Sequence, residues 1–245
     1  MYLIIKNIFK VHLFFYVFMF ICLITGHFWD YVYFVLIICF HELGHVLGGL
    51  IFSWKIEKII LLPIGGITIF NNLINTSLLE QFIVTLLGPL FQIIFYFILN
   101  YFFHFYSLVC FFNFFVLVFN LLPIFPLDGS KFLYIFLCFF FPFKFCHFFY
   151  LVISLLFLFI VLFFYCDIVM ALVFIFLFIS SIRELINHKN NFYKFLLERY
   201  MYNFNFKKLK VVNSVSKMRL NRRHVFFYCN KYITEREYLL KMFDK

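Results

Sequence analysis

The sequence is poor in charged residues, and this excludes most classes of soluble protein. Only 13% of its 245 residues are charged, whereas 66% are apolar. Soluble globular domains average about 25% charged and roughly 45–50% apolar residues, so a soluble cytosolic enzyme is excluded. Because a membrane-spanning helix needs about 20 apolar residues, the stretch 1–182 has room for about six of them.

The sequence also lacks the paired cysteines that would indicate a zinc ribbon or a redox motif. Its seven cysteines are scattered, and no two of them have the CxxC spacing. Six of the seven lie in apolar stretches. We therefore expect them to be small core or lipid-facing residues.

Acidic residues are scarce in the last part of the chain. Residues 183–245 hold fifteen Lys and Arg against five Asp and Glu, whereas residues 1–182 hold six of each kind. The net charge of +10 therefore belongs to residues 183–245. A basic segment next to a membrane domain is typical of the cytoplasmic side, where anionic lipid headgroups attract it. A nucleic-acid arm is a distant alternative, and we expect no direct nucleic-acid binding.

Long apolar runs dominate the chain up to residue 182, and they predict six membrane-spanning helices. The predicted spans are residues 8–26, 31–52, 78–103, 105–122, 146–166 and 168–182. The Lys and Arg residues of the connections all fall on one side, so the positive-inside rule places both termini in the cytoplasm. The sequence thus predicts an all-α polytopic membrane protein with a small basic cytoplasmic α/β tail.

Two segments interrupt the pattern of spans. Residues 59–70, IILLPIGGITIF, are apolar but too short to span, and Pro63 with the Gly65-Gly66 pair suits a short re-entrant hairpin. Residues 120–130, NLLPIFPLDGS, break a helix with two prolines and a glycine. Non-helical backbone survives at membrane depth only where protein or a water cavity satisfies its polar groups. The second break therefore predicts a functional site.

The strongest indication of chemistry is the sequence HELGH at residues 41–45, inside the second predicted span. Histidines four residues apart lie on one face of a helix, so His41 and His45 can reach one Zn²⁺. Glu42 lies beside them as a general base for a water at the metal. Ordinary core histidines are the alternative, but ionisable groups within a membrane span are costly and usually functional.

A catalytic zinc usually has three protein ligands and one open position. Asp128 lies in the second helix-breaking segment, and we predict it as the third ligand; an ordinary turn aspartate before Gly129 is the alternative. The other acidic candidates look like loop or cap residues: Asp30, Glu57, Glu80 and Asp167.

Three glycines flank the second histidine: Gly44, Gly48 and Gly49. Their small-xxx-small spacing would let the fourth predicted span approach closely and bring Asp128 to the metal. In the alternative interpretation, Gly44 and Gly48 serve helix packing alone.

Four motifs occur in order within residues 31–145: HELGH, the LLPIGGI hairpin, LLGPL in the next span and NLLPIFPLDG in the one after it. Together they resemble the site-2 protease family of intramembrane zinc metalloproteases (peptidase family M50). The resemblance implies His41, His45 and Asp128 as zinc ligands and Glu42 as the catalytic base. This agrees with the assignment made from the residues alone.

The resemblance also implies substrate-binding residues. Gly65 and Gly66 match the hairpin that the family is thought to use near the substrate. Asn120 matches an asparagine before the PxxPLDG run, with a role in holding substrate or orienting the site. Turn glycines and a helical asparagine also have structural explanations. Ser130 stands where relatives often carry a second glycine, outside the metal set.

Within the family, the six-span layout, the short tail and FLLERY at residues 195–200 look most like a sporulation branch. That branch implies a metalloendopeptidase that shortens a membrane-associated pro-sigma factor (pro-sigma-K type) near the cytoplasmic face. It also implies inhibitory membrane protein partners, and a location in the cell membrane or in a membrane around the forespore. The oligomeric state stays open.

Two other functions remain as alternatives. One is cleavage of another membrane substrate, such as an anti-sigma factor, which the lack of room for an inserted PDZ-like domain disfavours. The other is a non-catalytic membrane binding or escort protein on the same fold, which the intact HExxH and Asp128 disfavour.

The predicted organisation is a transmembrane zinc metalloprotease domain (1–182), a linker (183–205) and a basic cytoplasmic tail (206–245). The tail sequence predicts strand, helix, strand and helix in KLKVV, SVSKMRLNRR, HVFFYC and EREYLLKMF, the last with a capping box of Thr234 and Glu237. The sporulation branch carries a longer CBS-type regulatory domain here. A truncated CBS-like module is therefore one interpretation, and a basic tail lying on anionic lipid is the other.

Overall fold

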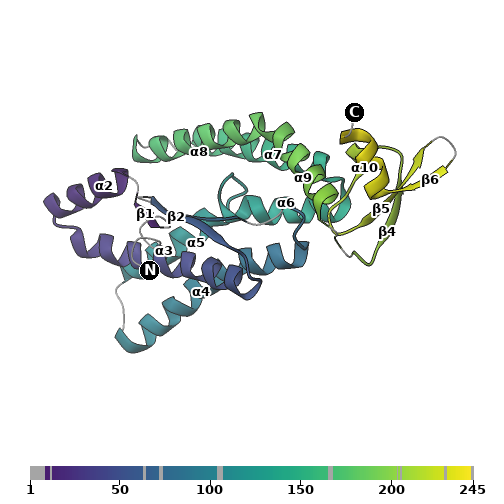
Figure 1. The fold of residues 1–245 in the computed structure, drawn as a ribbon. Helices are drawn as coiled ribbons and strands as arrows, with labels where there is room; N and C mark the ends of the chain where they lie inside the picture. The colour runs from purple at the N-terminus through teal and green to yellow at the C-terminus, as the bar shows by residue number, and fades with distance from the viewer. Residues whose placement is uncertain are drawn as a thin grey trace. The chain divides into compact units, whose positions relative to one another are not determined.

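The described part of the chain is mostly helical and carries two small sheets (Figure 1). The computed structural model describes residues 9–11, 13–62, 65–71, 74–103, 107–164, 168–202, 204, 206–228 and 231–243. Two compact units emerge, the first unit (Met1–Asn72 and Phe82–Leu121) and the second unit (Leu73–Gln81 and Leu122–Lys245). The HELGH motif belongs to the first unit and Asp128 to the second.

Apolar helices around a central one build the first unit. Its described helices are α2 (Leu13–Ile24), α3 (Phe28–Ile51), α4 (Leu78–Phe103, whose first turn belongs to the second unit) and α5 (Ser107–Asn120). Its described strands are β1 (Phe9–Val11), β2 (Ile56–Leu62) and β3 (Gly65–Phe70). The central helix is α3, because α2, α5 and β3 all pack against it.

The hairpin predicted from residues 59–70 takes the form of β2 and β3. The two strands pair antiparallel, with Leu61 opposite Gly66 and Ile59 opposite Thr68. β1 joins the other side of β2 in parallel, so the strand order is β1-β2-β3. The isoleucines favour strands, since β-branched side chains fit a pleated surface. Pro63 lies outside the described residues, and re-entry into the membrane stays a prediction.

The glycines of α3 allow close helix packing, but against a different helix from the one predicted. A Cβ on Gly44 would overlap the Leu87 carbonyl of α4, and one on Gly48 would lie 3.1 Å from the Val84 Cα atom, also on α4. The helix at Gly44 and Gly48 is therefore the third predicted span and not the fourth, although the fourth, α5, also packs against α3. Residues 84–88 of α4 instead reach the HELGH turn.

Three described helices are long and apolar enough to cross a membrane: Phe28–Ile51, Leu78–Tyr101 and Phe143–Phe163. Shorter apolar helices cover Phe15–Ile24 and Val109–Asn120. The chain is accordingly an integral membrane protein, whereas six crossings stay a prediction. The predicted first span is wrong at its start, because Phe9–Val11 form β1 and the helix begins only at Leu13.

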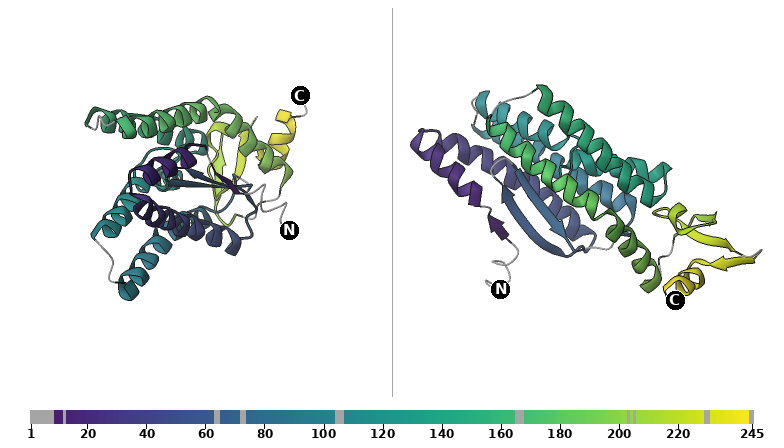
Figure 2. Two further views of the ribbon diagram at one scale, coloured as in Figure 1. Left: turned by 90° about the vertical axis from the view of Figure 1, so that its left-hand side faces the viewer. Right: turned by 90° about the horizontal axis from the view of Figure 1, so that it is seen from above.

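Helices α6 to α9 form the body of the second unit. They are α6 (Asp128–Phe140), α7 (Phe143–Phe164), α8 (Ile168–Ile186) and α9 (His188–Met201). α7 packs against α6, α8 and α9, and it runs beside α8 in the view from above (Figure 2). The segment 183–205, predicted as a linker, thus contains the regular helix α9. The predicted domain boundaries remain predictions.

The tail is a small α/β unit that differs from its predicted pattern in one element. It contains β4 (Leu209–Val212), the 3-10 turn η1 (Val215–Lys217), β5 (Arg223–Tyr228), β6 (Lys231–Thr234) and α10 (Glu235–Phe243). β4 is parallel and β6 antiparallel to the central β5. The predicted helix in SVSKMRLNRR is wrong, because only η1 forms there. The capping box is confirmed by reciprocal 3.4 Å bonds between Thr234 and Glu237.

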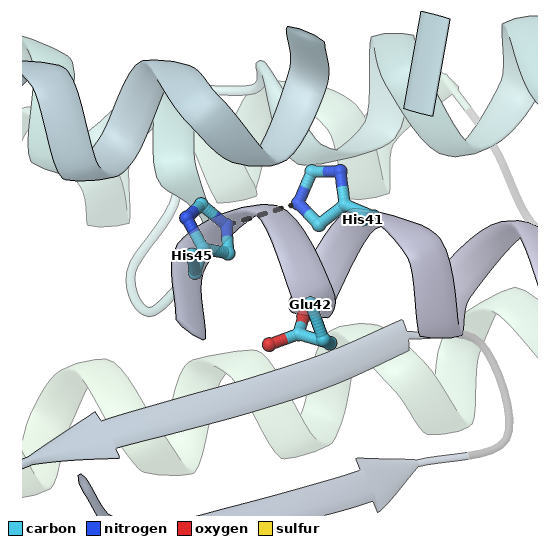
Figure 3. A group of neighbouring side chains, drawn as sticks. All are labelled: His41, Glu42 and His45. Atoms are coloured by element: carbon cyan, nitrogen blue, oxygen red, sulfur yellow. Dashed lines mark hydrogen bonds between the residues drawn. The ribbon is translucent and has the colours of Figure 1, made fainter. Parts of the chain in front are cut away.

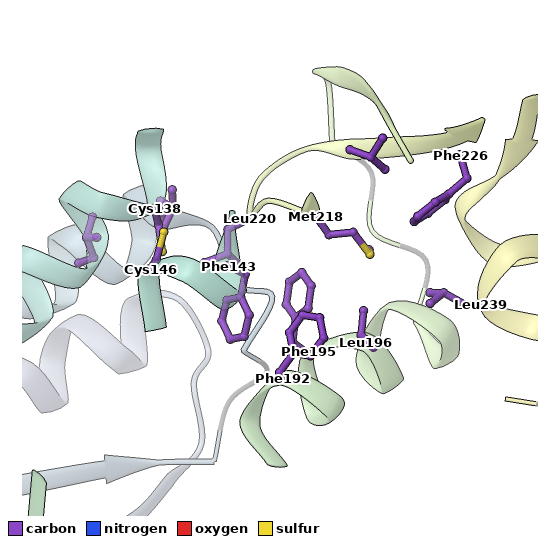
Figure 4. Packing of buried hydrophobic residues seen from close by; sticks show 13 residues of the cluster. Cys138, Phe143, Cys146, Phe192, Phe195, Leu196, Met218, Leu220, Phe226 and Leu239 are labelled. Carbon is purple, nitrogen blue, oxygen red and sulfur yellow. The ribbon is translucent and has the colours of Figure 1, made fainter. Parts of the chain in front are cut away.

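One face of the tail sheet packs on the helices of the second unit. Figure 4 shows Phe226 and Leu239 of the tail near Met218, with Leu196 and Phe195 of α9 below them. All five side chains are fully buried. Burial of such a side chain is worth roughly 1.5–3 kcal/mol, so this cluster fixes the tail to α9.

A buried arginine links this tail to the loop before α4. Arg199 of α9 donates from Nε to Asn75 Oδ1 (2.5 Å) and from Nη1 to Glu235 Oε1 (3.1 Å). Its guanidinium also donates to the carbonyl oxygens of Arg219 (3.0 Å) and Arg222 (2.8 Å). The side chain is 2% exposed. Arg199 therefore satisfies four separate acceptors away from water.

The contact between His224 and Glu235 makes the tail sensitive to acid. His224 accepts the Arg219 N–H at Nε2 (3.0 Å), so its Nδ1 donates to Glu235 Oε2 (3.3 Å). Burial lowers the pKa of His224, partly offset by Glu235. Burial by itself would raise the pKa of Glu235, but the His224 hydrogen bond and the Arg199 charge outweigh it and lower that pKa.

We expect acidification to loosen the tail. Because both pKa values are lowered in the folded tail, the unfolded tail binds protons more readily than the folded one. The stability of the tail therefore falls as the pH drops below about 6.5, the usual pKa of histidine. It falls further at lower pH, where Glu235 becomes protonated. Protonated His224 also loses the bond from the Arg219 N–H. Hydrogen exchange of β5 amides, corrected for intrinsic rates, should be faster at about pH 5.5 than at about pH 7.5. Constant protection across this range would contradict the expectation.

Candidate active site

The two histidines of HELGH converge on one point inside the first unit. Both project from the same face of α3, as spacing by four residues requires, and they are only 2% and 3% exposed. The Nε2 atoms of His41 and His45 lie 3.2 Å apart (Figure 3). The predicted pairing of the imidazoles is thus present in the structure.

Hydrogen bonds at the opposite ring nitrogens fix how both imidazoles are oriented. His41 Nδ1 lies 2.9 Å from Gln92 Oε1, and His45 Nδ1 lies 2.9 Å from the Val84 carbonyl oxygen. Both partners are acceptors, so each Nδ1 donates its proton. In the neutral rings each Nε2 then carries a lone pair. Metal-binding histidines typically have this arrangement.

The residues fit a metal ion. Two lone pairs facing each other at 3.2 Å repel unless a cation lies between them. Nitrogens about 2.0–2.1 Å from one zinc ion and 3.2 Å apart would subtend about 100° there, near the tetrahedral angle. Ligand atoms of His41, Glu42 and His45 all lie within 4.8 Å of one another, and they form the one group of three or more His, Cys, Asp or Glu residues in the described part of the chain that could hold a metal ion.

Glu42 lies beside the histidines, and its side chain is directed toward the hairpin. Figure 3 shows the carboxylate below the two imidazoles, on the side of α3 that faces a strand. Its Oε2 accepts a hydrogen bond from Thr68 Oγ1 of β3 (2.6 Å). Gly66 of β3 lies against the same carboxylate, because a Cβ there would be 2.7 Å from Glu42 Oε1. The hairpin thus supports the predicted base directly.

Gly88 plays a similar part for the second histidine. A Cβ at this position of α4 would overlap the His45 ring at Cε1 and Nε2. We expect Gly88→Ala to turn the imidazole and to weaken zinc affinity about 10–100-fold, the usual effect of disturbing an outer-shell contact. Competition with a chromophoric chelator in detergent measures this affinity.

Gly65→Ala is the matched control for that variant, since nothing lies within 4 Å of a Cβ at Gly65. It should bind zinc as wild type does. Equal zinc affinities for Gly88→Ala and Gly65→Ala would contradict the role assigned to Gly88.

Asp128 begins α6 in the second unit, and its side chain is almost fully buried at 5% exposure. Its Oδ1 lies 2.8 Å from Lys131 Nζ, one helical turn later. The segment before it carries a cis peptide bond between Phe125 and Pro126. Asp128 is thus buried directly after the helix break. The role of Asp128 as a metal ligand stays a prediction.

The predicted substrate-binding residues have different surroundings. Gly65 begins β3 with open space around it, whereas Gly66 lies against Glu42. Asn120 is the last residue of α5 and is 8% exposed. Contact of any of these three residues with substrate stays a prediction.

Three polar side chains around the site were not found from the sequence. Gln92 is fully buried in α4, and its Nε2 donates to the carbonyl oxygen (2.8 Å) and to Oδ1 (3.1 Å) of Asn113 on α5. This chain of hydrogen bonds fixes the amide that orients His41. Thr68 does the same for Glu42. The sequence does contain a pattern that could have indicated them, because each is a polar residue inside an otherwise apolar run.

Comparison with known proteins agrees with these features. Residues 30–108 match the model of Peptidase family M50, a family of metalloproteases. Over 134 residues, the chain is 37% identical to stage IV sporulation protein FB of Bacillus subtilis (strain 168). The matched region covers 51% of this chain and 46% of that protein. The chain therefore spans about half the length of the curated relative it matches.

The fold is also similar to a solved structure, that of a site-2 protease from Methanocaldococcus jannaschii. The TM-score is 0.57 at 23% identity, covering 72% of this chain and 90% of that chain. The matches to the family model and to the sporulation relative confirm the resemblance to peptidase family M50, which implies a metal cofactor, and the solved structure agrees with them in fold.

Proposed function

We propose that this chain, whose residues 30–108 match the model of peptidase family M50, is a zinc-dependent intramembrane metalloendopeptidase. The observation that carries the proposal is the 3.2 Å approach of the His41 and His45 Nε2 atoms, with both Nδ1 protons donated elsewhere. The proposed ligands are His41, His45 and Asp128, and the proposed base is Glu42.

The chemistry is hydrolysis of a peptide bond within the membrane. When bound, zinc supplies the Lewis acidity that polarises a carbonyl and lowers the pKa of a coordinated water toward about 7. Glu42 takes a proton from the attacking water as oxygen bonds to the carbonyl carbon, and it returns the proton to the amine nitrogen as the C–N bond breaks. Thr68 holds the carboxylate through this cycle by its 2.6 Å hydrogen bond.

A substrate helix must unwind to expose its peptide bond, and the hairpin offers a partner for the extended chain. β3 is an edge strand of the described sheet, and its Thr68 and Gly66 contact Glu42. An extended substrate pairing with β3 would therefore be placed alongside the base. Gly65 and Gly66, which have no side chains to obstruct this approach, are the proposed contacts, together with Asn120.

The proposed substrate is a membrane-associated pro-sigma factor of the pro-sigma-K type, cut near the cytoplasmic face during sporulation. Support comes from the 37% identity to a stage IV sporulation protein and from the loop lysines, which favour a cytoplasmic location for the hairpin, the PLDG segment and both termini. Inhibitory membrane proteins are the proposed partners, and a membrane of the sporulating cell is the proposed location. The basic tail remains proposed as a short CBS-like module.

Co-expression in a non-sporulating bacterial host tests the proposal. A pro-sigma-K type substrate should be shortened on a blot by wild type and remain intact with His41→Ala, which removes a zinc ligand. If neither shortens it although the purified wild-type protein carries zinc, the substrate assignment fails while the metal site survives. Absence of zinc from the purified wild-type protein would sink the metalloprotease assignment itself.

A further inference from the structure

The segment between α5 and α6 contains backbone N–H and carbonyl groups that are not hydrogen-bonded within a helix or a strand. It comprises residues 121–127, with Pro123 and Pro126 lacking N–H groups. Turn hydrogen bonds account for part of it: the Ile124 N–H donates to the Leu122 carbonyl and the Leu127 N–H to the Ile124 carbonyl, both at 2.8 Å. Unsatisfied peptide groups are expensive at membrane depth, so the partners of Phe125 matter.

Two serines from separate helices take up both polar groups of the Phe125 backbone. The Phe125 N–H donates to Ser154 Oγ of α7 at 2.7 Å. The Phe125 carbonyl accepts a hydrogen bond from Ser181 Oγ of α8 at 3.2 Å. Both serines are completely buried at 0% exposure. The irregular segment is thus held at one residue by two neighbouring helices.

These contacts are unusual for serines in apolar helices. Such hydroxyls commonly bond to a carbonyl one turn earlier in their own helix, as Ser180 does with the Phe176 carbonyl at 2.9 Å. Ser154 and Ser181 instead engage a segment far away in the sequence. Removing either hydroxyl would leave a Phe125 peptide group without its partner in a buried place, which is costly.

Only two residues separate Phe125 from Asp128, so a shift of the Phe125 backbone also moves Asp128. The intervening Leu127 is also constrained, because its carbonyl accepts both the Ser130 N–H (3.1 Å) and the Ser130 Oγ hydroxyl (2.7 Å). From Phe125 to the first turn of α6, the backbone has little freedom.

We propose that Ser154 and Ser181 are positioning residues that set the place of the Asp128 carboxylate by clamping the Phe125 peptide groups. The inference rests on the proposed function, in which Asp128 is the third zinc ligand. Neither serine is among the proposed zinc ligands or substrate contacts; the contacts used here are those with the Phe125 backbone. Their effect is expected on metal affinity and coordination geometry, through Asp128 alone.

The test uses the full-length protein in detergent, loaded with zinc for affinity and with cobalt(II) for its visible absorption spectrum. Ser154→Ala and Ser181→Ala should each weaken zinc affinity about 10–100-fold, as second-shell changes do. Their cobalt spectra should move toward that of Asp128→Asn. Ser180→Ala, which loses only a bond within its own helix, should match wild type in both measurements. Ser181→Thr, which keeps the hydroxyl, should recover most of the affinity.

A double-variant cycle separates positioning from a general loss of structure. If the serines act through Asp128, Ser154→Ala should cause little further loss in zinc affinity in an Asp128→Asn background. Additive losses of zinc affinity in the double variant would overturn the proposal. The proposal also fails if both serine variants keep the wild-type zinc affinity and cobalt spectrum while Asp128→Asn changes the affinity and the spectrum. If Asp128→Asn itself leaves both unchanged, the third-ligand assignment of the proposed function fails and the inference fails with it.

Discussion

Replacing Glu42 with glutamine is expected to abolish proteolysis while zinc stays bound. Glutamine has almost the same shape, and its carbonyl oxygen can still accept the hydrogen bond from Thr68 Oγ1 that Glu42 Oε2 accepts at 2.6 Å. The amide cannot take a proton from water. General acid–base groups contribute about 10²–10⁴-fold to rate, so cleavage should fall by at least that range.

The measurement pairs zinc content with substrate shortening in the same preparation. Zinc bound per chain should equal that of wild type, because His41 and His45 keep their Nδ1 partners. Glu57→Gln is the matched control, since Glu57 forms an exposed ion pair with Lys58 at 3.1 Å. It should cleave as wild type does. Continued proteolysis by Glu42→Gln would remove Glu42 from the mechanism.

The parts of the site that could be predicted are those set by local spacing. His41 and His45 are four residues apart on one helix, so their common face follows from helical geometry alone. The hairpin at 59–70 was also predictable, because its glycines and isoleucines indicate a turn between strands. Both features depend on residues close together in the sequence.

The supports of the site could not be predicted in the same way. Gln92 acts on His41 from 51 residues away, and it is held in turn by Asn113 on a third helix. No periodicity in a single segment shows which polar residue meets which. The helix predicted in SVSKMRLNRR failed for a related reason: Met218 and Leu220, two residues apart, are both buried against helices of the second unit, a spacing that suits extended chain.

FLLERY at residues 195–200 illustrates the same limit. Before the structure, these six residues were informative only through their resemblance to relatives. In the structure, Glu198 accepts hydrogen bonds from the N–H groups of Ile74 (3.0 Å) and Asn75 (3.1 Å). Arg199 binds Asn75 and Glu235, which lie 124 and 36 residues away. Glu198 and Arg199 of this segment therefore connect α9 to the tail and to the loop before α4.

Arg199→Met, a change in α9, is expected to destabilise the tail more than any other single change. It removes the donors to Asn75 Oδ1, to two carbonyl oxygens and to Glu235, whose carboxylate is then left without its arginine. Breaking one partner of a buried ion pair costs about 3–5 kcal/mol. Amide exchange of β4, β5 and β6 should accelerate accordingly, measured by mass spectrometry on the full chain in detergent.

Two further variants identify the origin of that loss. Lys194→Met removes a positive charge from an exposed position of the same helix and should leave exchange in the tail unchanged. Arg199→Met combined with Glu235→Gln should be more protected than Arg199→Met alone, because the uncompensated carboxylate is gone. Equal exchange in Arg199→Met and Lys194→Met would mean that the α9 contacts of Phe226 and Leu239, and not the ion pair, hold the tail in place.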